Sequence, residues 1–272
     1  ALSHWDEIDN TSSSALHMPP STITEVTREE LLNASQASAE TINLLVKRQM
    51  LETYELEVGR LNHGGDYRPE LIKPLTLAQE NAYNGILMSM MKKNVTLLHG
   101  VTGSGKTEIY IHLIRQALEQ KQQVLYLLPE IALTVQMMQR LQRIFGDRLG
   151  IYHSRYSDAE RVEIWQKQLS QNPYDVILGA RSAVFLPFQR LGLIIVDEEH
   201  ETSYKQQDPA PRYHARSAAI MLAQMSNTIS HVTPKVLLGT ATPSLESYHN
   251  AKTGKYGLVE LTERYQGMEL PE

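Results

Sequence analysis

Cysteine is absent from the 272-residue sequence, which excludes disulfides and thiolate-bound zinc or iron–sulfur sites within this segment. No apolar run approaches the roughly 18 residues that a membrane-spanning helix needs, and no signal-peptide pattern opens the chain. We therefore expect a cytoplasmic protein with no membrane partner. The formal net charge is −5, so any face that binds nucleic acid must be local rather than a property of the whole chain.

The length and the 42% hydrophobic content allow one large or two modest domains. The chain begins without methionine and stops just after a strand-like segment, so we expect a piece of a longer protein. Composition changes near residue 74, which favours two parts of different character.

The first part is predicted to be small and of mixed α and β type. Residues 1–22 are rich in Ser, Thr and Pro and indicate no clear element. Residues 23–33 predict a short helix, because a threonine N-cap is followed three residues later by glutamate. Residues 38–51 have helical periodicity, and 53–58 alternate like a strand. This order is typical of a winged helix, so we predict a winged-helix-like domain over 1–60, although many small α+β pieces share it.

The second part is predicted to be an α/β domain. Residues 61–74 contain glycines and prolines and indicate a linker. From residue 75 to 272, continuous apolar runs alternate with segments of helical periodicity, which predicts a mostly parallel sheet covered by helices on both faces. The expected strands are residues 94–99, 122–129, 148–153, 174–179, 191–197 and 234–239.

A phosphate-binding loop follows the first of these strands. The segment GVTGSGKT fits the pattern G-x-x-x-x-G-K-[ST] at every position and opens a helix, which is the setting this chemistry requires. Backbone N–H groups and the helix N-terminus hold phosphate oxygens, Lys106 reaches the β- and γ-phosphates, and Thr107 offers its hydroxyl to Mg²⁺. The alternative is a glycine-rich turn with a solvated lysine. The predicted nucleotide-binding residues are Gly100, Val101, Thr102, Gly103, Ser104, Gly105, Lys106 and Thr107.

Two acids end the apolar run at residues 191–197. Ligands of open parallel sheets bind at the carboxyl ends of strands, so Asp197 and Glu198 are predicted to face the phosphate loop. Asp197 is expected to hold Mg²⁺ through water, and Glu198 to polarise the attacking water. We therefore predict Lys106, Asp197 and Glu198 as catalytic residues. The acids could alternatively cap the next helix. Their combination with the phosphate loop favours hydrolysis over kinase chemistry.

Seven motifs resemble one helicase family. GVTGSGKTE, LPEIALT, HS at 153–154, GARSAVFLPF, IIVDEEHETSYKQQ, PRYHAR and GTATPSLES stand in the order found in PriA-type helicases, the bacterial replication-restart (primosomal N′) proteins of superfamily 2. The resemblance covers residues 75 to about 262. It implies a RecA-like P-loop NTPase lobe, the first ATPase lobe of the helicase, over 75–272, preceded by the winged helix.

The resemblance also implies residue roles around the nucleotide. Gln79 in LTLAQ corresponds to the residue that recognises adenine, and His200 to one that bridges the ATP state to the coupling motif. The coupling motif itself would link the two acids to DNA movement, and its residues are Gly239, Thr240 and Thr242.

DNA contacts are implied on several loops. Residues 203–216 resemble an aromatic-rich loop that senses single-stranded DNA, and aromatics interleaved with cations suit base stacking and phosphate contact. Without the resemblance, a proline-rich surface loop is the simpler interpretation. The implied contacts are Glu130, Thr134, His153, Ser154, Arg181, Ser182, Tyr204, Lys205, Arg212, Tyr213, His214 and Arg216.

The function implied is that of one lobe of a 3′-to-5′ DNA helicase that remodels stalled forks in the bacterial cytoplasm. Its cofactors would be ATP and Mg²⁺, and its partners forked and single-stranded DNA, primosomal restart proteins and single-strand-binding protein. The family's zinc module and arginine finger belong to a second lobe, so zinc is expected only there. Two alternatives are a nucleotide-dependent DNA-binding switch that does not unwind, and a small P-loop kinase or metabolic ATPase. The coupling motif and the aromatic loop argue against the last.

Overall fold

The computed structural model describes residues 31, 35, 38–48, 50, 65–130, 132–153, 156–230 and 233–264. Contacts divide the chain into two compact units, Ala1–Val58 and Gly59–Glu272. Within the described part of the chain, no helix is both long and apolar enough to cross a membrane.

In the first unit the structure describes one helix, α2 (Ala39–Lys47). Ser38 caps it by accepting from the backbone N–H of Thr41, and Ile42 is buried. The helix ends earlier than the sequence periodicity over 38–51 predicts. Arg48 is its C-cap, with φ −86° and ψ 6°, and the N–H of Met50 donates to the carbonyl of Leu45 outside the helical pattern. Apart from Leu31, the predicted helix at 23–33 and the predicted strand at 53–58 lie outside the described residues.

The second unit is built on a seven-stranded sheet in the order β3-β4-β2-β5-β6-β1-β7. Every neighbouring pair is parallel, as the alternation of strands and helices predicts. The edge strand β7 was not among the expected strands. Its residues are mostly only half-buried, so it lacks a continuous apolar run. The strands are β1 (Val95–Gly100), β2 (Gln123–Leu127), β3 (Leu149–Tyr152), β4 (Val176–Gly179), β5 (Leu191–Asp197), β6 (Lys235–Thr240) and β7 (Gly257–Leu261).

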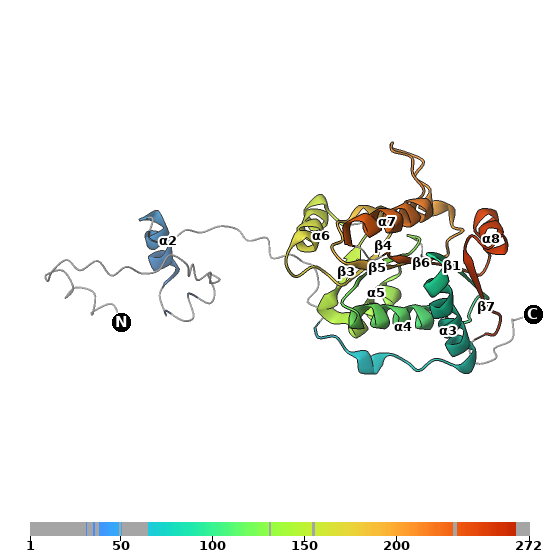
Figure 1. The fold of residues 1–272 in the computed structure, drawn as a ribbon. Helices are drawn as coiled ribbons and strands as arrows, with labels where there is room; N and C mark the ends of the chain where they lie inside the picture. The colour runs from blue at the N-terminus through green and yellow to red at the C-terminus, as the bar shows by residue number, and fades with distance from the viewer. Residues whose placement is uncertain are drawn as a thin grey trace, which may run out of the picture. The chain divides into compact units, whose positions relative to one another are not determined.

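Helices cover both faces of this sheet (Figure 1). On one face lie α3 (Leu77–Lys92), α4 (Lys106–Glu119) and α5 (Val135–Phe145). On the other lie α6 (Asp158–Leu169), α7 (Ala215–Ser230) and α8 (Leu245–Lys252). Side-chain caps fix where several of them begin, and α3 and α6 each carry a complete capping box. Short 3-10 turns complete the unit: η2 (Pro69–Leu71), η3 (Gly146–Arg148), η4 (Arg181–Phe185) and η5 (Thr202–Tyr204).

Two apolar layers explain the continuous hydrophobic runs of the strands. Along β5, Ile195 packs into the layer under α4, while Ile194 and Val196 pack into the layer under α7. All three are fully buried, and each such side chain contributes roughly 1.5–3 kcal/mol relative to exposure. Burial on both faces is the condition under which strands lose their polar alternation. The predicted α/β fold, a RecA-like lobe, is confirmed.

The segment expected as a linker is packed from residue 65 onward. Tyr67 stacks on Phe145 with ring centres 6.0 Å apart, and the Arg148 guanidinium lies 5.0 Å from the Tyr67 ring centre. The N–H of Arg68 donates to the carbonyl of Ile144. Tyr67 thus fastens this stretch to the end of α5, which glycine and proline content alone did not indicate.

Candidate nucleotide-binding site

The motifs of the predicted site meet at the carboxyl ends of three adjacent strands. In the sheet, β6 lies between β5 and β1. β1 ends at Gly100, β5 at Asp197 and β6 at Thr240. The phosphate loop, the acid pair and the coupling motif are therefore neighbours in space, at the edge where open parallel sheets bind ligands.

The phosphate loop has the backbone shape that its glycines allow. Gly103 and Gly105 adopt left-handed φ angles of 77° and 78°, which side chains other than glycine rarely tolerate. Gly105 is the N-cap of α4, which has no side-chain cap, so its first N–H groups remain available to an anion. The loop also closes on itself, because the N–H of Ser104 donates to the carbonyl of Val101.

Two buried side chains of the loop carry polar groups suited to phosphate. Lys106 is only 8% exposed; its Nζ donates to the carbonyl of Gly100 over 2.9 Å and lies 3.7 Å from Glu198 Oε1. Ser104 Oγ is buried and finds no hydrogen-bond partner among the described residues. A buried hydroxyl left unpaired is unfavourable. A phosphate oxygen in the loop would satisfy it and place a second anion beside Lys106.

Gln79 lies beside this loop and supports it. Its Nε2 donates to the carbonyls of Ser104 and Gly105, at 3.0 and 3.4 Å. Its Oε1 accepts from the N–H of Thr76, in the capping box of α3. Both polar ends of the side chain are engaged with protein, so adenine recognition stays a prediction. The supporting role was missed, since nothing local to LTLAQ points at residues 104–105.

Asp197 is held by buried tyrosines. Tyr110 Oη donates to Asp197 Oδ1 over 2.9 Å, and Tyr126 Oη lies 3.4 Å from Oδ2. Burial raises the pKa of Asp197 to about 6, and the neighbouring Glu198 carboxylate adds to the rise. Hydrogen bonding from Tyr110 and the charge of Lys106 oppose it. Two adjacent carboxylates, one of them buried, favour a bound cation.

Glu198 stands in a strained backbone conformation. Its φ is 46°, in the left-handed region that a residue with a Cβ enters at a cost of roughly 1–2 kcal/mol. The side chain points between the loop and β6, with Oε1 3.7 Å from Lys106 Nζ and Oε2 3.5 Å from Thr240 Oγ1. Strain at one residue of an acid pair is typical of a functional position.

His200 joins the acid motif to the coupling motif. Its Nδ1 is 2.7 Å from Thr240 Oγ1, and its Nε2 is 3.3 Å from Thr242 Oγ1. The N–H of Thr242 donates to Thr240 Oγ1 as well. The structure thus brings together the residues predicted for coupling, Gly239 included, because β6 pairs with β5 at Asp197 and Gly239.

Glu199 was not singled out in the sequence, yet it is the most enclosed acid here. It is fully buried and accepts from Arg216 Nη1 at 2.5 Å, from the N–H and Oγ of Ser244, and from Ser247 Oγ. Burial raises the pKa of Glu199, but the hydrogen bonds from Ser244, Arg216 and Ser247 outweigh it and hold the pKa below its ordinary value. The third residue of DEEH therefore ties β5 to the starts of α7 and α8.

Two predicted DNA contacts need correction. Arg216 is largely enclosed and its guanidinium serves Glu199 and Ser244, so it is not a free cation for phosphate. Tyr204 is 1% exposed, and its hydroxyl donates to the carbonyls of Leu127 and Asp197. Its ring cannot stack on a base, because it is packed under the ends of β2 and β5.

The rest of the aromatic loop folds as a small ribbon. Lys205 and His214 form an isolated antiparallel bridge, and Lys205 Nζ donates to the carbonyl of Arg212. Arg212 is exposed and Tyr213 half-buried. Burial lowers the pKa of His214, and the charges of Arg216 and Lys205 lower it further. A neutral His214 with Arg212 and Tyr213 leaves a polar and aromatic surface on this ribbon.

Arg181 fastens the ribbon to the lobe. At the start of η4, its Nη1 donates to the carbonyls of Ser203 and Lys205, at 3.2 and 3.0 Å. Burial raises the pKa of Tyr213, and the nearby Arg181 opposes that rise. The adjacent Ser182 is exposed. Arg181 therefore shapes the loop, and a direct DNA contact from it remains a prediction.

The remaining predicted DNA contacts lie on other loops. Glu130 is exposed, and Thr134 caps α5 by accepting from the N–H of Met137. His153 follows β3 and packs against Tyr156, with ring centres 4.0 Å apart. Ser154 lies outside the described residues.

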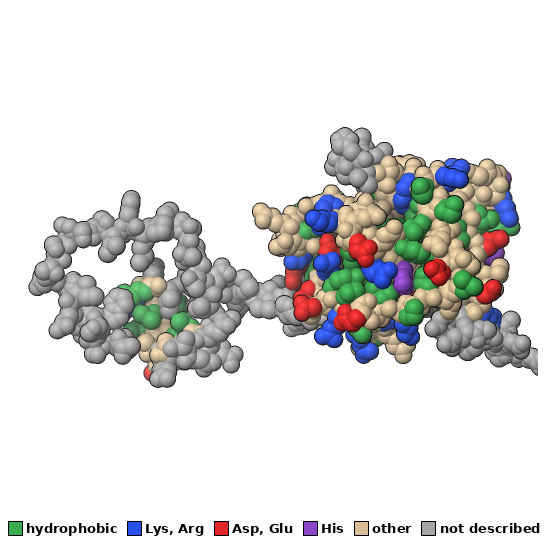
Figure 2. Space-filling model, turned by 60° about the horizontal axis from the view of Figure 1, so that its bottom comes forward, with side chains coloured by type: hydrophobic (Ala, Val, Ile, Leu, Met, Phe, Trp, Pro, Cys, Tyr) green, Lys and Arg blue, Asp and Glu red, His purple; other side chains and the backbone are tan. Residues whose placement is uncertain are grey.

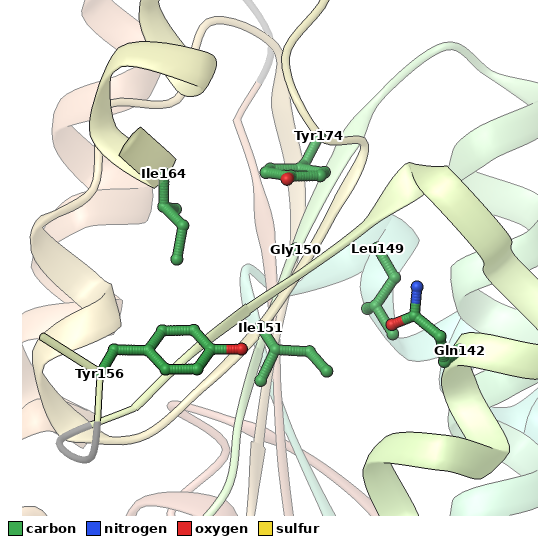
Figure 3. Close-up of a pocket in the computed structure, with 7 residues that line it drawn as sticks. All are labelled: Gln142, Leu149, Gly150, Ile151, Tyr156, Ile164 and Tyr174. Atoms are coloured by element: carbon green, nitrogen blue, oxygen red, sulfur yellow. The ribbon is translucent and has the colours of Figure 1, made fainter. Parts of the chain in front are cut away.

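A pocket at the far edge of the sheet is separate from this site. It lies over Gly150 on β3, and Figure 3 shows Tyr156, Ile164 and Tyr174 pointing into it. A Cβ at Gly150 would stand 2.6 Å from the Tyr174 ring, so glycine makes room for that ring. β3 and β1 lie toward opposite edges of the sheet, so this pocket does not belong to the nucleotide site.

The donors at the strand ends fit ATP with a hard divalent cation. Carboxylate and hydroxyl oxygens, here from Asp197 and Thr107, are the ligands Mg²⁺ prefers. The unpaired Ser104 hydroxyl, the buried Lys106 and the open start of α4 suit phosphate. Parallel sheet, phosphate loop, acid pair and threonine-based coupling motif together define an ATPase lobe of the helicase type.

Comparison with known proteins identifies the family. Residues 76–251 match the family described as DEAD/DEAH box helicase, and residues 2–58 match the winged helix domain of PriA helicase from Bacteroidota. The chain belongs to the DEAD/DEAH box helicase family. Within that family it is of the PriA type, with the winged helix and the first helicase lobe.

Relatives support this assignment. Replication restart protein PriA of Chlamydia trachomatis is 42% identical over 248 residues, which are 88% of this chain and 31% of the relative. Its counterpart in Bacillus subtilis is 41% identical over 251 residues, which are 89% of this chain and 30% of the relative. In Haemophilus influenzae the identity is 48% over 171 residues, which are 63% of this chain and 22% of the relative. The chain thus spans about a third of the length of the first two.

Solved structures agree on the fold. The helicase Lhr of Mycobacterium smegmatis, bound to ssDNA and AMP-PNP, matches with a TM-score of 0.51 and 20% identity, over 70% of this chain and 26% of its own. The helicase domain of Hef from Pyrococcus furiosus also has a TM-score of 0.51 and 20% identity, over 74% of this chain and 41% of its own. At this identity the likeness establishes the fold alone.

Proposed function

We propose that this chain is the ATP-binding lobe of a 3′-to-5′ DNA helicase that remodels stalled or abandoned replication forks so that a replisome can reload. One observation supports a link between the nucleotide site and the coupling motif. The Thr240 hydroxyl, in the coupling motif, lies 3.5 Å from Glu198 Oε2 and 2.7 Å from His200 Nδ1, both in the acid motif.

The hydrolytic step follows from the groups at the strand ends. The backbone N–H groups of the loop and Lys106 hold the phosphates, while Thr107 and Asp197 would hold Mg²⁺, which neutralises phosphate charge when bound. Glu198 orients the attacking water and accepts its proton. The Lys106 ammonium lies 3.7 Å from Glu198 Oε1 and holds that carboxylate beside the phosphate loop.

Movement of the coupling motif has a direct path to Glu198. We expect a shift of β6 to change the distance from Thr240 to Glu198. His200 and the N–H of Thr242 contact the same hydroxyl. We expect nucleotide state and DNA position to bias one another through this shared hydroxyl, with the reciprocity that linkage requires.

The DNA side of the lobe is expected near the aromatic ribbon. The exposed Arg212 and the half-buried Tyr213 there supply a phosphate contact and a stacking ring. On the face shown in Figure 2, the described acidic and basic side chains are interspersed and form no continuous basic stripe. By resemblance, forked and single-stranded DNA, restart proteins and single-strand-binding protein are the proposed partners.

The site is expected to be half of a composite one. The chain covers 31% and 30% of its relatives from Chlamydia and Bacillus. In helicases of this class a second lobe closes over the nucleotide, so we expect the 272-residue chain alone to bind ATP weakly and to turn it over slowly.

Strand displacement tests the proposal. The full gene product is mixed with ATP, Mg²⁺ and partial duplexes carrying either a 3′ or a 5′ single-stranded tail, with Lys106→Ala as the matched control. We expect unwinding of the 3′-tailed duplex by the unmodified protein and none by the control. DNA-stimulated hydrolysis without any strand displacement would instead support a nucleotide-dependent switch and overturn the helicase proposal.

A further inference from the structure

Tyr110 contacts the metal-binding acid from the phosphate-loop helix. It lies on α4 one turn after Lys106, is fully buried, and donates to Asp197 Oδ1 over 2.9 Å. Its ring packs edge-on against Tyr126, with centres 5.6 Å apart and planes at 73°. The phenol is therefore fixed in place, so it also fixes the oxygen it meets.

The two oxygens of Asp197 are unequally occupied. Oδ1 accepts from Tyr110 and from the N–H of Glu198 at 3.0 Å. Oδ2 has the Tyr126 hydroxyl at 3.4 Å, a long and weak contact. Oδ1 is thus engaged with protein, and Oδ2 is the oxygen that remains for a cation or its water.

The coupling motif makes room for this phenol. β5 and β6 pair Asp197 with Gly239, directly beside the tyrosine. A Cβ at Gly239 would stand 1.8 Å from Tyr110 Oη and 2.9 Å from its Cζ. Neither distance is sterically possible, so a side chain at 239 and the hydroxyl of Tyr110 exclude each other.

We propose that Tyr110 is a positioning residue that turns Asp197 so that Oδ2 faces the Mg²⁺ site, and that Gly239 is glycine to admit its hydroxyl. The inference rests on the proposed function for its metal role. The Tyr110 hydroxyl lies between the phosphate-loop helix, the metal-binding acid and the coupling motif. A displacement of β6 would therefore alter the position of Asp197 as well as that of Glu198.

Metal-dependent nucleotide binding tests the positioning role. Binding of a fluorescent ATP analogue to the 272-residue chain is titrated with Mg²⁺, for the unmodified chain and for Tyr110→Phe. Groups that orient a metal ligand typically change metal affinity 10–100-fold, so we expect half-saturation to need about 10-fold more Mg²⁺, with Mg²⁺-free binding unchanged. Tyr83→Phe is the control, because Tyr83 donates to Gln116 away from the site. If Tyr110→Phe needs no more Mg²⁺ than the unmodified chain and Tyr83→Phe, the positioning role of Tyr110 is overturned.

A double-mutant cycle tests the geometry without any ligand. Thermal unfolding is measured for Gly239→Ala, for Tyr110→Phe and for the double variant. We expect Gly239→Ala to lower the melting temperature, and to lower it less when residue 110 is Phe. The relief should be partial, since the Cζ contact persists. Additive losses would show that the hydroxyl and residue 239 do not compete.

The two experiments separate this inference from the proposed function. If the unmodified chain binds no ATP analogue at any Mg²⁺ concentration, the proposed function fails, and the cycle still decides whether Tyr110 and Gly239 compete. If the unmodified chain shows Mg²⁺-dependent binding and Tyr110→Phe matches it, only the positioning role fails.

Discussion

The Arg216 guanidinium donates to the Glu199 carboxylate over 2.5 Å, and Glu199 has no exposed surface. Glu199 also accepts from Ser244 and Ser247, so one carboxylate holds the end of β5, the start of α7 and the start of α8 together. The attraction within a buried charge pair adds little net stability, because both charges lose their hydration. Removal of one partner is strongly destabilising, because it leaves the other charge buried and uncompensated.

Loss of Arg216 should therefore destabilise the lobe. For Arg216→Ala we expect about 3 kcal/mol less free energy of unfolding, the lower end of the range for breaking a buried pair. Denaturant unfolding of the 272-residue chain measures it. Arg212→Ala, at an exposed position on the same loop, is the matched control and should change stability by less than about 0.5 kcal/mol. If the two substitutions change the free energy of unfolding equally, Arg216 acts as a surface cation and not as the partner of Glu199.

Relief of strain at Glu198 should raise stability while activity is lost. Glycine tolerates the φ of 46°, so Glu198→Gly should be more stable than Glu198→Ala by about 1 kcal/mol. Both variants lack the carboxylate, so both remove its repulsion of Asp197 and both should lose turnover. Comparison of their melting temperatures isolates the backbone term. A less stable glycine variant would show that this conformation is not strained.

Tyr204 and Tyr213 should behave in opposite ways. Tyr204→Phe removes the hydroxyl that donates to the carbonyls of Leu127 and Asp197, which should reduce the free energy of unfolding by about 1–2 kcal/mol. Its affinity for single-stranded DNA should not change, because the ring is buried. Tyr213→Ala should weaken DNA binding, because stacking on an aromatic ring contributes about 1–3 kcal/mol per base. Its effect on the free energy of unfolding should be smaller than that of Tyr204→Phe.

Single-stranded DNA binding by the full gene product, measured by fluorescence anisotropy at low salt, distinguishes the two tyrosines. A large loss of affinity in Tyr204→Phe, with unchanged folding, would contradict the internal role of that residue.

Local patterns explain why much of this lobe was predictable. A phosphate loop requires glycines, a lysine and a hydroxyl at fixed spacing, and a strand buried on both faces requires a continuous apolar run. Residues 100–107 and 191–198 show both patterns in contiguous sequence. The edge strand β7 was not predicted, because its half-buried residues do not form a continuous apolar run.

Contacts between distant segments were not predictable in this way. Composition shows that a loop contains arginine and tyrosine, but not which of them turn inward. Arg216 turns toward Glu199, and Tyr204 reaches two strand ends, because the sheet brings those carboxylate and carbonyl groups within reach. The space at Gly239 for the Tyr110 hydroxyl likewise follows from strand register.

We propose that ATP is hydrolysed at this site and that DNA controls the rate. The direct measurement is ATP turnover by the full gene product at low salt, with and without single-stranded or forked DNA, beside Glu198→Gln. We expect DNA to raise the rate severalfold in the unmodified protein, and Glu198→Gln to bind ATP normally but not turn it over. A rate indifferent to DNA, or loss of ATP binding together with turnover in Glu198→Gln, would contradict the account.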